Sequence, residues 1–469
     1  LLNFKGIEFM KRVLINIFMV LIFTIMSCSK DMNVSSADIV TLIDNELYVS
    51  RADTVIKSAD AVKVANLFSY NGTEATKGNF SKSVKSVNEF KDSESELGVY
   101  VVNYEGGGWV LVSSTKKHYP ILAYSDKGIF CTDTLNGVSL YLNSYKREIN
   151  RKHKLPVSDV KSEMEAWKVY EEKNMPGYYM TKDSDPITSL IGESVIQWSN
   201  EGYDVYPITE DEIDGLPANV LAEFKALAAA AEDYGEEYHN TSFILKNSEA
   251  NQPNYNNYKL TTEWGQGGEY NDHVPEDNLL GCVTVAIGQI MWYHKHHSLL
   301  RNMIYPTSSQ MDTISYMLSE IRANVATDPS SYEGGSNIYR AKLYFEEEGY
   351  GLQLEENHTY ANIPSTLRNY GPVFMRGGVA SDPSLGHAWV CDGFTQYSSY
   401  RMYKLMTISI FSGLDYVESA SYGPVQSTNV NYYHMNWGYD GNNNGWYTQW
   451  ASMMGYDYDR MNLINIRPN

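Results

Sequence analysis

Basic residues are few in this sequence. Its 469 residues include 37 Lys and Arg against 57 Asp and Glu, so the formal net charge is −20. Because binding to phosphate groups needs clustered Lys and Arg, this balance argues against nucleic acid as a partner. A solvated acidic surface is sufficient to explain the charge. No internal repeat is visible in the sequence.

The N-terminal apolar run is too short to span a bilayer comfortably. It covers Val13–Met26 and follows the basic pair Lys11-Arg12. A basic start, a short apolar run and a small residue before the cut are typical of a secretory signal. The end of the run, Ile25–Cys28 (Ile-Met-Ser-Cys), resembles the lipobox of bacterial lipoproteins, whose cysteine is lipidated after cleavage. We expect residues 1–28 to be a signal segment with a lipobox-like end. Export to the bacterial cell envelope or beyond follows, with a lipid on Cys28 as membrane anchor; an ordinary secretory signal is the alternative.

Cysteine is scarce. The chain has four, at positions 28, 131, 282 and 391. If Cys28 carries lipid, three remain, and an odd number in an exported protein favours a free, reactive thiol.

Apolar and aromatic residues are plentiful. They make up 43% of the chain, which includes 38 tyrosines, and the length allows two sizeable cores. Composition divides the chain into four parts. After the signal segment we expect a small α+β domain over residues 30–165, a linker exposed to proteolysis over 166–255, and a second domain over 256–469.

Hydrophobic periodicity predicts the elements of the first two folded parts. For the N-terminal domain we predict a helix over Asp60–Phe68, a loop over Asn71–Glu96, a hairpin of Val99–Tyr104 with Trp109–Ser113, strands at Pro120–Tyr124 and Gly128–Phe130, and a helix over Ser139–Ile149. In the linker, Pro217 opens a predicted helix that Gly235 closes.

The second domain is predicted to begin with helices and to end with strands. Helices are expected after Cys282 and over Ser315–Ala323 and Ile338–Glu348. Strands are expected at Val373–Arg376, His387–Phe394, Tyr403–Ile410, Tyr432–Trp437 and Trp446–Trp450. This order indicates a helical lobe followed by an antiparallel β lobe.

Cys282 stands at the start of the first of these helices. Ala286, Ile287, Ile290 and Met291 recur at helical spacing behind it. Unpaired backbone N–H groups and the helix dipole favour negative charge at a helix start, so this position is expected to lower the pKa of the thiol. A small buried hydrophobic cysteine is the alternative.

A cysteine nucleophile needs a base, an orienting group and oxyanion donors. The candidate base is His387, which follows Gly386 at a strand start, although a surface histidine is the commoner use of such a position. Asn436 is the candidate orienting group, because an amide oxygen can fix an imidazole without titrating. Trp437 could cover that hydrogen bond, and the amide of Gln266 could hold an oxyanion together with the backbone N–H of Cys282.

The order of these segments along the chain, and the residues in them, resemble the streptopain family of papain-like cysteine peptidases. The matching segments are Trp264–Gln266, Gly281–Val283 followed by Gln289–Met291 and Tyr293–His294, Gly386–Ala388, and Asn436–Tyr439. The N-terminal domain is similar to that family's propeptide at Val101–Tyr104, Trp109–Ser113 and Ile121–Asp126.

The resemblance implies an α+β protein: a papain-like two-lobed catalytic domain preceded by a small α+β prodomain. It further implies a cysteine endopeptidase made as a zymogen. Cys282 would be the nucleophile, His387 the general acid/base, Asn436 the orienting group, Gln266 the oxyanion donor and Trp437 the shielding aromatic. Protein or peptide substrates are implied, and the propeptide would cover the cleft as an intramolecular inhibitor. No metal or organic cofactor is expected.

Two alternatives stay open: an acyl transferase or amidase of the same fold, and a non-catalytic surface binding protein. One departure from the family is the Tyr-rich insertion Gln396–Thr428, which is expected to form either a flap over the cleft or a surface excursion.

Three further patterns favour structural roles. Asp440–Gly445 begins like a calcium loop, but Ala451 stands where a bidentate Glu is needed, so a turn is favoured. The histidines at 294, 296 and 297 lack further ligands at a recognisable spacing, which argues against zinc. Cys391, four residues after His387, is expected to be a core residue.

Overall fold

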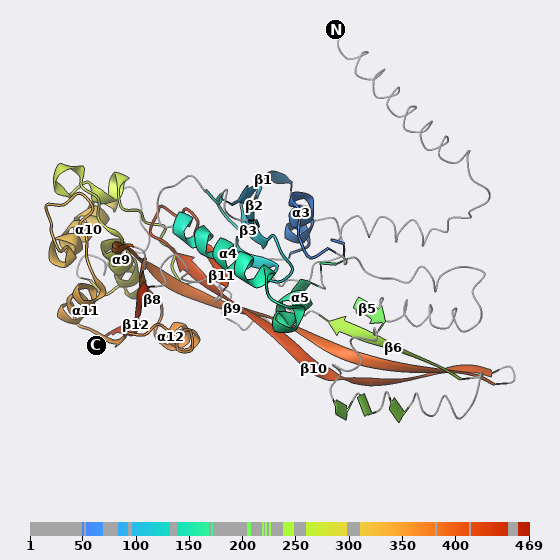
Figure 1. Ribbon diagram of the computed structural model, residues 1–469. Coiled ribbons are helices and arrows are strands. Elements are labelled where there is room, and N and C mark those ends of the chain that lie inside the picture. Colours follow the sequence, from blue (N-terminus) through green and yellow to red (C-terminus); the bar gives the residue numbers. More distant parts are fainter. Residues whose placement is uncertain are drawn as a thin grey trace, which may run out of the picture. The chain divides into compact units, whose positions relative to one another are not determined.

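The computed structural model describes residues 49–50, 53–68, 83–91, 96–131, 138–167, 170–171, 204–207, 218–219, 221–222, 225–226, 238–247, 259–297, 310–379, 382–411, 414–448 and 458–469. These residues form a mixed α/β structure built on a large antiparallel sheet (Figure 1). Its separation into two lobes stays a prediction. Within the described part, no helix combines the length and apolarity needed to cross a membrane. The signal segment and Cys28 lie outside the described residues.

The described strands pair in one sheet. They are β1 (Val84–Phe90), β2 (Val99–Tyr104), β3 (Trp109–Ser113), β4 (Ile121–Ser125), β5 (Asp204–Pro207), β6 (Tyr238–Asn247), β7 (Tyr350–Glu355), β8 (Val373–Val379), β9 (Asp382–Phe411), β10 (Leu414–Asn436), β11 (Gly445–Thr448) and β12 (Tyr458–Pro468). The order across the sheet is β1-β2-β3-β4-β11-β10-β9-β8-β12-β7, with β6 pairing both β5 and β9.

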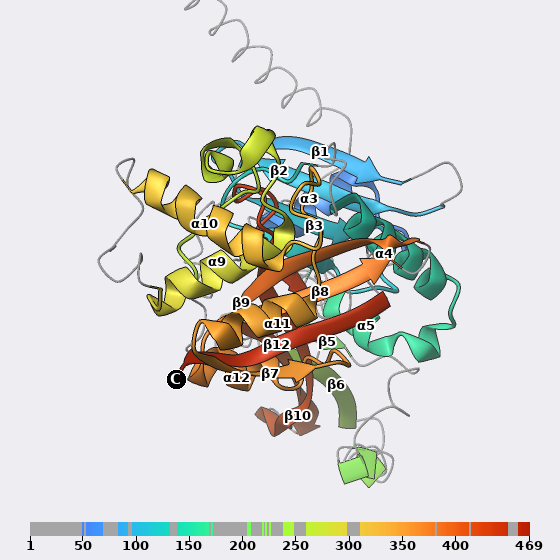
Figure 2. The ribbon, with the colours of Figure 1, turned by 90° about the vertical axis from the view of Figure 1, so that its left-hand side faces the viewer.

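The helices lie in two groups along the chain. They are α3 (Ser58–Leu67), α4 (Val138–His153) and α5 (Lys161–Trp167), then α9 (Cys282–His294), α10 (Met311–Val325), α11 (Ile338–Glu347) and α12 (Ile363–Asn369). Short 3₁₀ turns cover Val157–Asp159, Gly268–Asn271 and Pro275–Asp277. In both ribbon views α9, α10 and α11 lie together beside β8 and β12 (Figure 1, Figure 2).

The N-terminal and C-terminal strands join at what we call the junction: β4 paired with β11, together with the side chains packed around that pair. Ala123 and Tyr124 of β4 pair with Tyr447 and Trp446 of β11. One hydrophobic cluster spans both sides. Its members include Trp109, Leu111, Leu122 and Tyr145 from the N-terminal domain and Tyr433, Met435, Trp437 and Tyr447 from the C-terminal part. The two parts are therefore built around a shared core.

Several N-terminal predictions are confirmed and two are wrong. The hairpin forms with Asn103 opposite Trp109, and the helices appear as α3 and α4. The loop predicted over 71–96 contains β1, whose side chains are mostly half-exposed and so show little hydrophobic periodicity. Residues 128–130 form no strand; instead the backbone N–H of Phe130 donates to the side chain of Asn103 at 2.7 Å.

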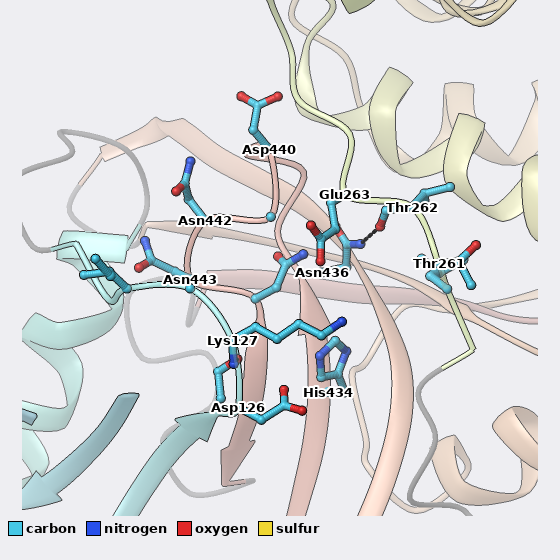
Figure 3. Close-up of a pocket in the computed structure, with 16 residues that line it drawn as sticks. Asp126, Lys127, Thr261, Thr262, Glu263, His434, Asn436, Asp440, Asn442 and Asn443 are labelled. Atoms are coloured by element: carbon cyan, nitrogen blue, oxygen red, sulfur yellow. Dashed lines mark hydrogen bonds between the residues drawn. The ribbon is translucent and has the colours of Figure 1, made fainter. Parts of the chain in front are cut away.

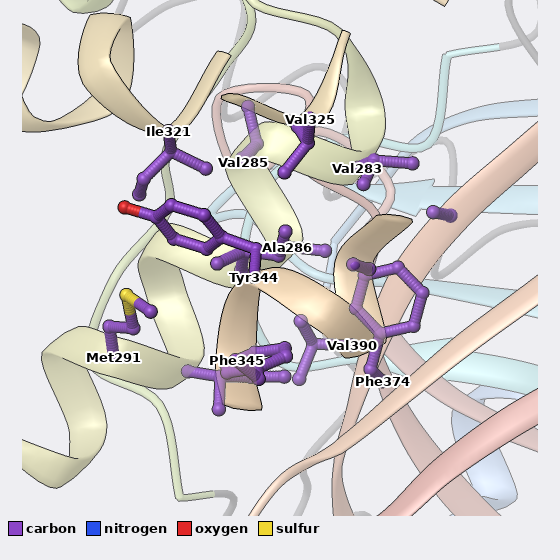
Figure 4. Close-up of a cluster of buried hydrophobic side chains, with 14 of the residues drawn as sticks. Val283, Val285, Ala286, Met291, Ile321, Val325, Tyr344, Phe345, Phe374 and Val390 are labelled. Carbon is purple, nitrogen blue, oxygen red and sulfur yellow. The ribbon is translucent and has the colours of Figure 1, made fainter. Parts of the chain in front are cut away.

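Helix α9 is buried on nearly all sides. The expected apolar stripe faces the core, where Val283, Ala286 and Met291 lie near residues of α10, α11 and the sheet (Figure 4). Gly288 allows the close packing: a Cβ atom there would lie 2.5 Å from the side chain of Leu318 on α10. The apolar residues predicted from the sequence are buried, but Thr284 and Gln289 between them are buried as well, so α9 is a core helix and not one buried along a single side.

The insertion Gln396–Thr428 is a long antiparallel ribbon. Strands β9 and β10 pair from Gln396 opposite Asn431 outward to Phe411 opposite Leu414, and β6 pairs along the other edge of β9. Whether the ribbon is a flap over the cleft or a surface excursion stays a prediction.

Only part of the predicted linker helix lies among the described residues. Residues 218–219, 221–222 and 225–226 are helical. The described strands β5 and β6 also come from the 166–255 segment, where no strand was predicted.

Candidate active site

Cys282 is the first residue of α9, as the sequence predicts. The chain enters the helix through Gly281, which has φ +84° and where a Cβ atom would lie 3.0 Å from the carbonyl oxygen of Glu333. Glycine is needed at this position because other residues rarely adopt such a conformation. The sharp entry leaves the thiol at the rim of a cleft.

The cleft has a volume of about 470 Å³ and brings together residues from distant parts of the chain. Cys282 comes from α9, His387 from β9, Gln266 from the loop before the 3₁₀ turn Gly268–Asn271, and Arg376 from β8. The backbone of Gln266 accepts a 2.9 Å hydrogen bond from Leu280, which ties its loop to the entry into α9. The structure thus places three predicted site residues around one cavity.

The ionisation expected for Cys282 is wrong for this state of the protein. Burial raises the pKa of the thiol, and backbone hydrogen bonds at Ala388, Val283 and Cys282 itself oppose that rise without overcoming it. The helix start is present, but removing water from the sulfur costs the thiolate more than the local dipoles return. Cys282 is therefore a neutral thiol near neutral pH.

His387 is buried and faces groups other than those predicted. Its Nε2 lies 2.9 Å from the carbonyl oxygen of Trp437, and its Nδ1 lies 3.2 Å from the hydroxyl of Tyr439. Burial lowers the pKa of His387 to about 4, with the Trp437 carbonyl opposing the shift. The imidazole is therefore neutral at neutral pH.

Asn436 does not orient His387 in this structure. Its Nδ2 donates to the carbonyl of Thr262 at 2.7 Å and to Gln289 Oε1 at 3.0 Å. Its Oδ1 accepts from Gln289 Nε2 at 3.1 Å and from the backbone N–H of Gly438 at 3.2 Å.

Trp437 contacts His387 in a different way from the one predicted. Its indole lies roughly parallel to the imidazole, with ring centroids 6.2 Å apart, and its carbonyl accepts the hydrogen bond from Nε2. The predicted role of Trp437 was to shield a hydrogen bond between Asn436 and His387. Because the amide of Asn436 is bonded to Thr262 and Gln289 instead, that hydrogen bond is absent, and Trp437 only packs against the imidazole ring.

Sequence reasoning missed two residues of this site. Gln289 is fully buried on α9 and bonds both Asn436 and Thr262, the latter at 2.8 Å. The sequence did contain a signal for Gln289. It is an amide side chain among the apolar residues of the helix, and buried polar groups are nearly always paired. Tyr439 stood within the quoted Asn436–Tyr439 segment, but nothing in the sequence showed that it faces His387.

A second cavity of about 370 Å³ lies at the boundary with the N-terminal domain (Figure 3). One wall is the loop Ser125–Ile129, and the others are Leu260–Glu263 and the turn Asp440–Asn444. At its edge His434 Nδ1 lies 2.6 Å from a carboxylate oxygen of buried Asp392. None of the described N-terminal residues lines the Cys282 cleft, and the expected cover over that cleft stays a prediction.

The other residues considered from the sequence have structural roles. The Asp440–Gly445 segment is a turn in which Asp440, Gly441 and Asn443 have positive φ. Among the described residues, no group of three or more His, Cys, Asp or Glu is arranged to hold a metal ion. Cys391 is fully buried, and burial raises the pKa of its thiol well above the usual value.

Residues 53–149 match the family model of the Spi protease inhibitor. Among solved structures, the chain is similar to a mutant fragment, residues 39–359, of prointerpain A from Prevotella intermedia. The identity is 13% and the TM-score 0.39, over 82% of this chain and 99% of that one. At that level the likeness carries no argument about fold or activity. A search of curated proteins found no match.

These findings reach only the N-terminal part of the chain, where residues 53–149 are similar to a family of protease inhibitors. A protease-related role for the chain follows from that similarity.

Proposed function

We propose that the chain is the zymogen of a streptopain-like cysteine endopeptidase with a papain-like catalytic domain. The observation that carries the proposal is the convergence of Cys282, His387 and Gln266 on one cleft from three separate segments. An inhibitor-type domain in the same chain supports it, because a peptidase that carries its own inhibitor is a familiar form of zymogen.

In the active form, the Cys282 thiol transfers its proton to His387, and the sulfur attacks the carbonyl carbon of a peptide bond. The amide of Gln266 and the backbone N–H of Cys282 donate to the oxyanion. His387 then gives its proton to the leaving amine, and an acyl-enzyme remains. Water, deprotonated by His387, attacks the acyl carbon, and the acid product leaves as the proton returns to the sulfur.

The state described above fits a precursor. Thiol and imidazole are both neutral, since burial raises the pKa of Cys282 and lowers the pKa of His387 to about 4. Catalysis then requires a rearrangement in which Asn436 or an equivalent group orients the imidazole and Trp437 shields that contact. The activation cut is proposed within about residues 165–255.

Two other functions stand beside this proposal. An acyl transferase or amidase would use the same residues on another acyl substrate. A non-catalytic surface binding protein is favoured by one observation, the engagement of Asn436 with Gln289 and Thr262 instead of His387. We further propose that residues 1–28 direct export, with the chain anchored through Cys28 or released.

The test compares three purified chains: the unaltered one, Cys282→Ala and Cys131→Ala. Cys131 is a free, partly exposed cysteine outside the cleft and serves as the matched control. We expect N-terminal processing and casein cleavage in the first and third chains and their loss in the second, with inhibition by an epoxide-type thiol reagent.

Unchanged processing in Cys282→Ala would point to a different protease or nucleophile. Processing without casein cleavage would favour the transferase, and absence of both, with no labelling of Cys282 by an alkylating probe, would favour the binding protein.

A further inference from the structure

Tyr439 packs face to face against the imidazole ring of His387, the candidate base. Its ring is parallel to that of His387 within 8°, with centroids 4.8 Å apart, and its hydroxyl lies 3.2 Å from Nδ1. It also lines the cleft that contains Cys282. A tyrosine so placed can affect both the position and the protonation of the imidazole.

The hydrogen bond at the other ring nitrogen determines the direction of this contact. The carbonyl of Trp437 can only accept, so Nε2 of His387 carries the proton. In a neutral imidazole Nδ1 then holds the lone pair, and the hydroxyl of Tyr439 donates to it. That lone pair is the basic site of the ring, and it is occupied by the phenol.

The turn that carries Tyr439 is held in place by neighbouring backbone. Gly438 has φ +73°, the carbonyl of Tyr439 accepts from Asn442 at 2.9 Å, and Asp440 N–H donates to the carbonyl of Trp264 at 3.4 Å. These bonds close a tight turn, so the position of Tyr439 depends on the conformation of the whole segment 438–444.

The N-terminal domain touches this same turn. The backbone N–H of Cys131 donates to Asn443 Oδ1 at 3.0 Å, and the loop Ser125–Ile129 lines the second cavity together with Asp440–Asn444 (Figure 3). The N-terminal domain therefore contacts the same turn that carries Tyr439, and Tyr439 contacts His387.

We propose that Tyr439 is a positioning residue that blocks His387 in the precursor, its hydroxyl occupying the lone pair of Nδ1 that would accept the thiol proton of Cys282. The N-terminal domain supports this block through Asn443. The inference rests on the proposed function, in which His387 acts as a base toward Cys282.

The test is the rate at which iodoacetamide alkylates Cys282 in the full-length chain, followed by mass spectrometry of the Cys282 peptide as a function of pH. Tyr439→Phe keeps the stacked ring and removes the hydroxyl. We expect its rate near neutral pH to rise about fivefold, the equivalent of one neutral hydrogen bond, with the profile moved to lower pH. Tyr316→Phe, a half-exposed tyrosine on α10, is the control and should leave the rate unchanged.

A second variant tests the support from the N-terminal domain. Asn443→Gly keeps the positive φ of this position and removes the acceptor for Cys131. We expect a smaller rise, about twofold, because the hydroxyl of Tyr439 is retained. An unchanged rate in this variant would remove the N-terminal domain from the proposal.

An unchanged or slower rate in folded Tyr439→Phe would overturn the role of Tyr439. If that variant does not fold, as judged by thermal unfolding, Tyr439→Leu takes its place with the same expectation. Casein cleavage by the processed parent chain is measured separately. Cleavage without a change in alkylation refutes the block and leaves the peptidase standing, whereas faster alkylation without any cleavage refutes the peptidase alone.

Discussion

The junction and the cleft differ in how their polar groups are paired. At the junction the hydroxyl of Tyr432 donates to Ile121 at 3.1 Å and that of Tyr145 donates to Leu122 at 2.6 Å, so side chains reinforce the β4–β11 pairing. At the cleft, His387 is bonded to the carbonyl of Trp437, and Asn436, which lies outside the lining of that cleft, is bonded to Thr262 and not to His387. At the junction the side-chain hydrogen bonds reinforce the strand pairing, whereas at the cleft the hydrogen bond predicted between Asn436 and His387 is not formed.

The comparison shows where the N-terminal domain contacts the rest of the protein. It adds strands to the edge of the sheet and shares a core with it, and its described residues stay out of the cleft. The predictions below test each half of the comparison, beginning with the largest expected effect.

Trp109→Ala should weaken the junction most. Trp109 is buried, and its ring lies edge-on to that of Phe130 with ring centroids 4.7 Å apart. It also packs closely against β11, because a Cβ atom added to Gly445 would lie 2.7 Å from the indole of Trp109. Removing a buried indole costs about 3–5 kcal/mol, so the urea midpoint should fall sharply. Tyr316→Ala, at a half-exposed position, is the control. A loss below about 1 kcal/mol would show that the junction is not a true core.

Acid should destabilise both regions through buried histidines. Burial, aided by the charge of Lys152, lowers the pKa of His118 to about 3, and burial lowers the pKa of His387 to about 4. The unfolded chain then binds more protons than the folded one. Stability is therefore full above about pH 6.5 and is lost as the pH falls toward 4, by a few kcal/mol for each residue.

Urea unfolding at about pH 7 and about pH 5 measures this slope. His118→Asn, in the N-terminal domain, and His387→Asn, in the cleft, should each flatten it. An identical pH dependence in both variants and the parent would contradict the assignment of the slope to these histidines.

Asn436→Ala should lower the stability of the precursor without changing the alkylation of Cys282, and should lower the activity of the processed enzyme. In the precursor it removes buried hydrogen bonds to Thr262 and Gln289 and should cost about 1–3 kcal/mol, while alkylation of Cys282 stays unchanged. In the processed enzyme, casein cleavage should fall roughly a hundredfold if Asn436 then orients His387. Gln289→Ala is the matched variant for the lost hydrogen bonds. Equal activity in the processed Asn436→Ala and parent forms would exclude an orienting role.

Cutting the linker should have the smallest effect. A protease site inserted between residues 172 and 203 is expected to yield two fragments that elute together at the mass of the uncut chain, because the shared core and the β4–β11 pairing do not depend on the linker. Elution of a separate N-terminal fragment without denaturant would show that the junction alone is insufficient to hold the domain.

The strongest sequence patterns predicted their elements well. The apolar residues after Cys282 and the β-branched hairpin Val99–Ser113 are local signals, and the predicted helix and hairpin both form. The placement of Cys282 at a helix start and of His387 on a strand is likewise confirmed, with both lining one cleft. Strand β1 was missed because its polar, half-exposed residues contain little periodic signal.

The sequence by itself determined which residues can do chemistry and on which elements they stand, since helix and strand periodicities are local. Only the tertiary structure decided the protonation and the partners of those residues. Desolvation raises the pKa of Cys282 against the helix dipole, Asn436 pairs with Gln289, and Tyr439 reaches His387. Burial and hydrogen-bond partners come from segments far apart in the chain, and no local pattern records which of them will meet.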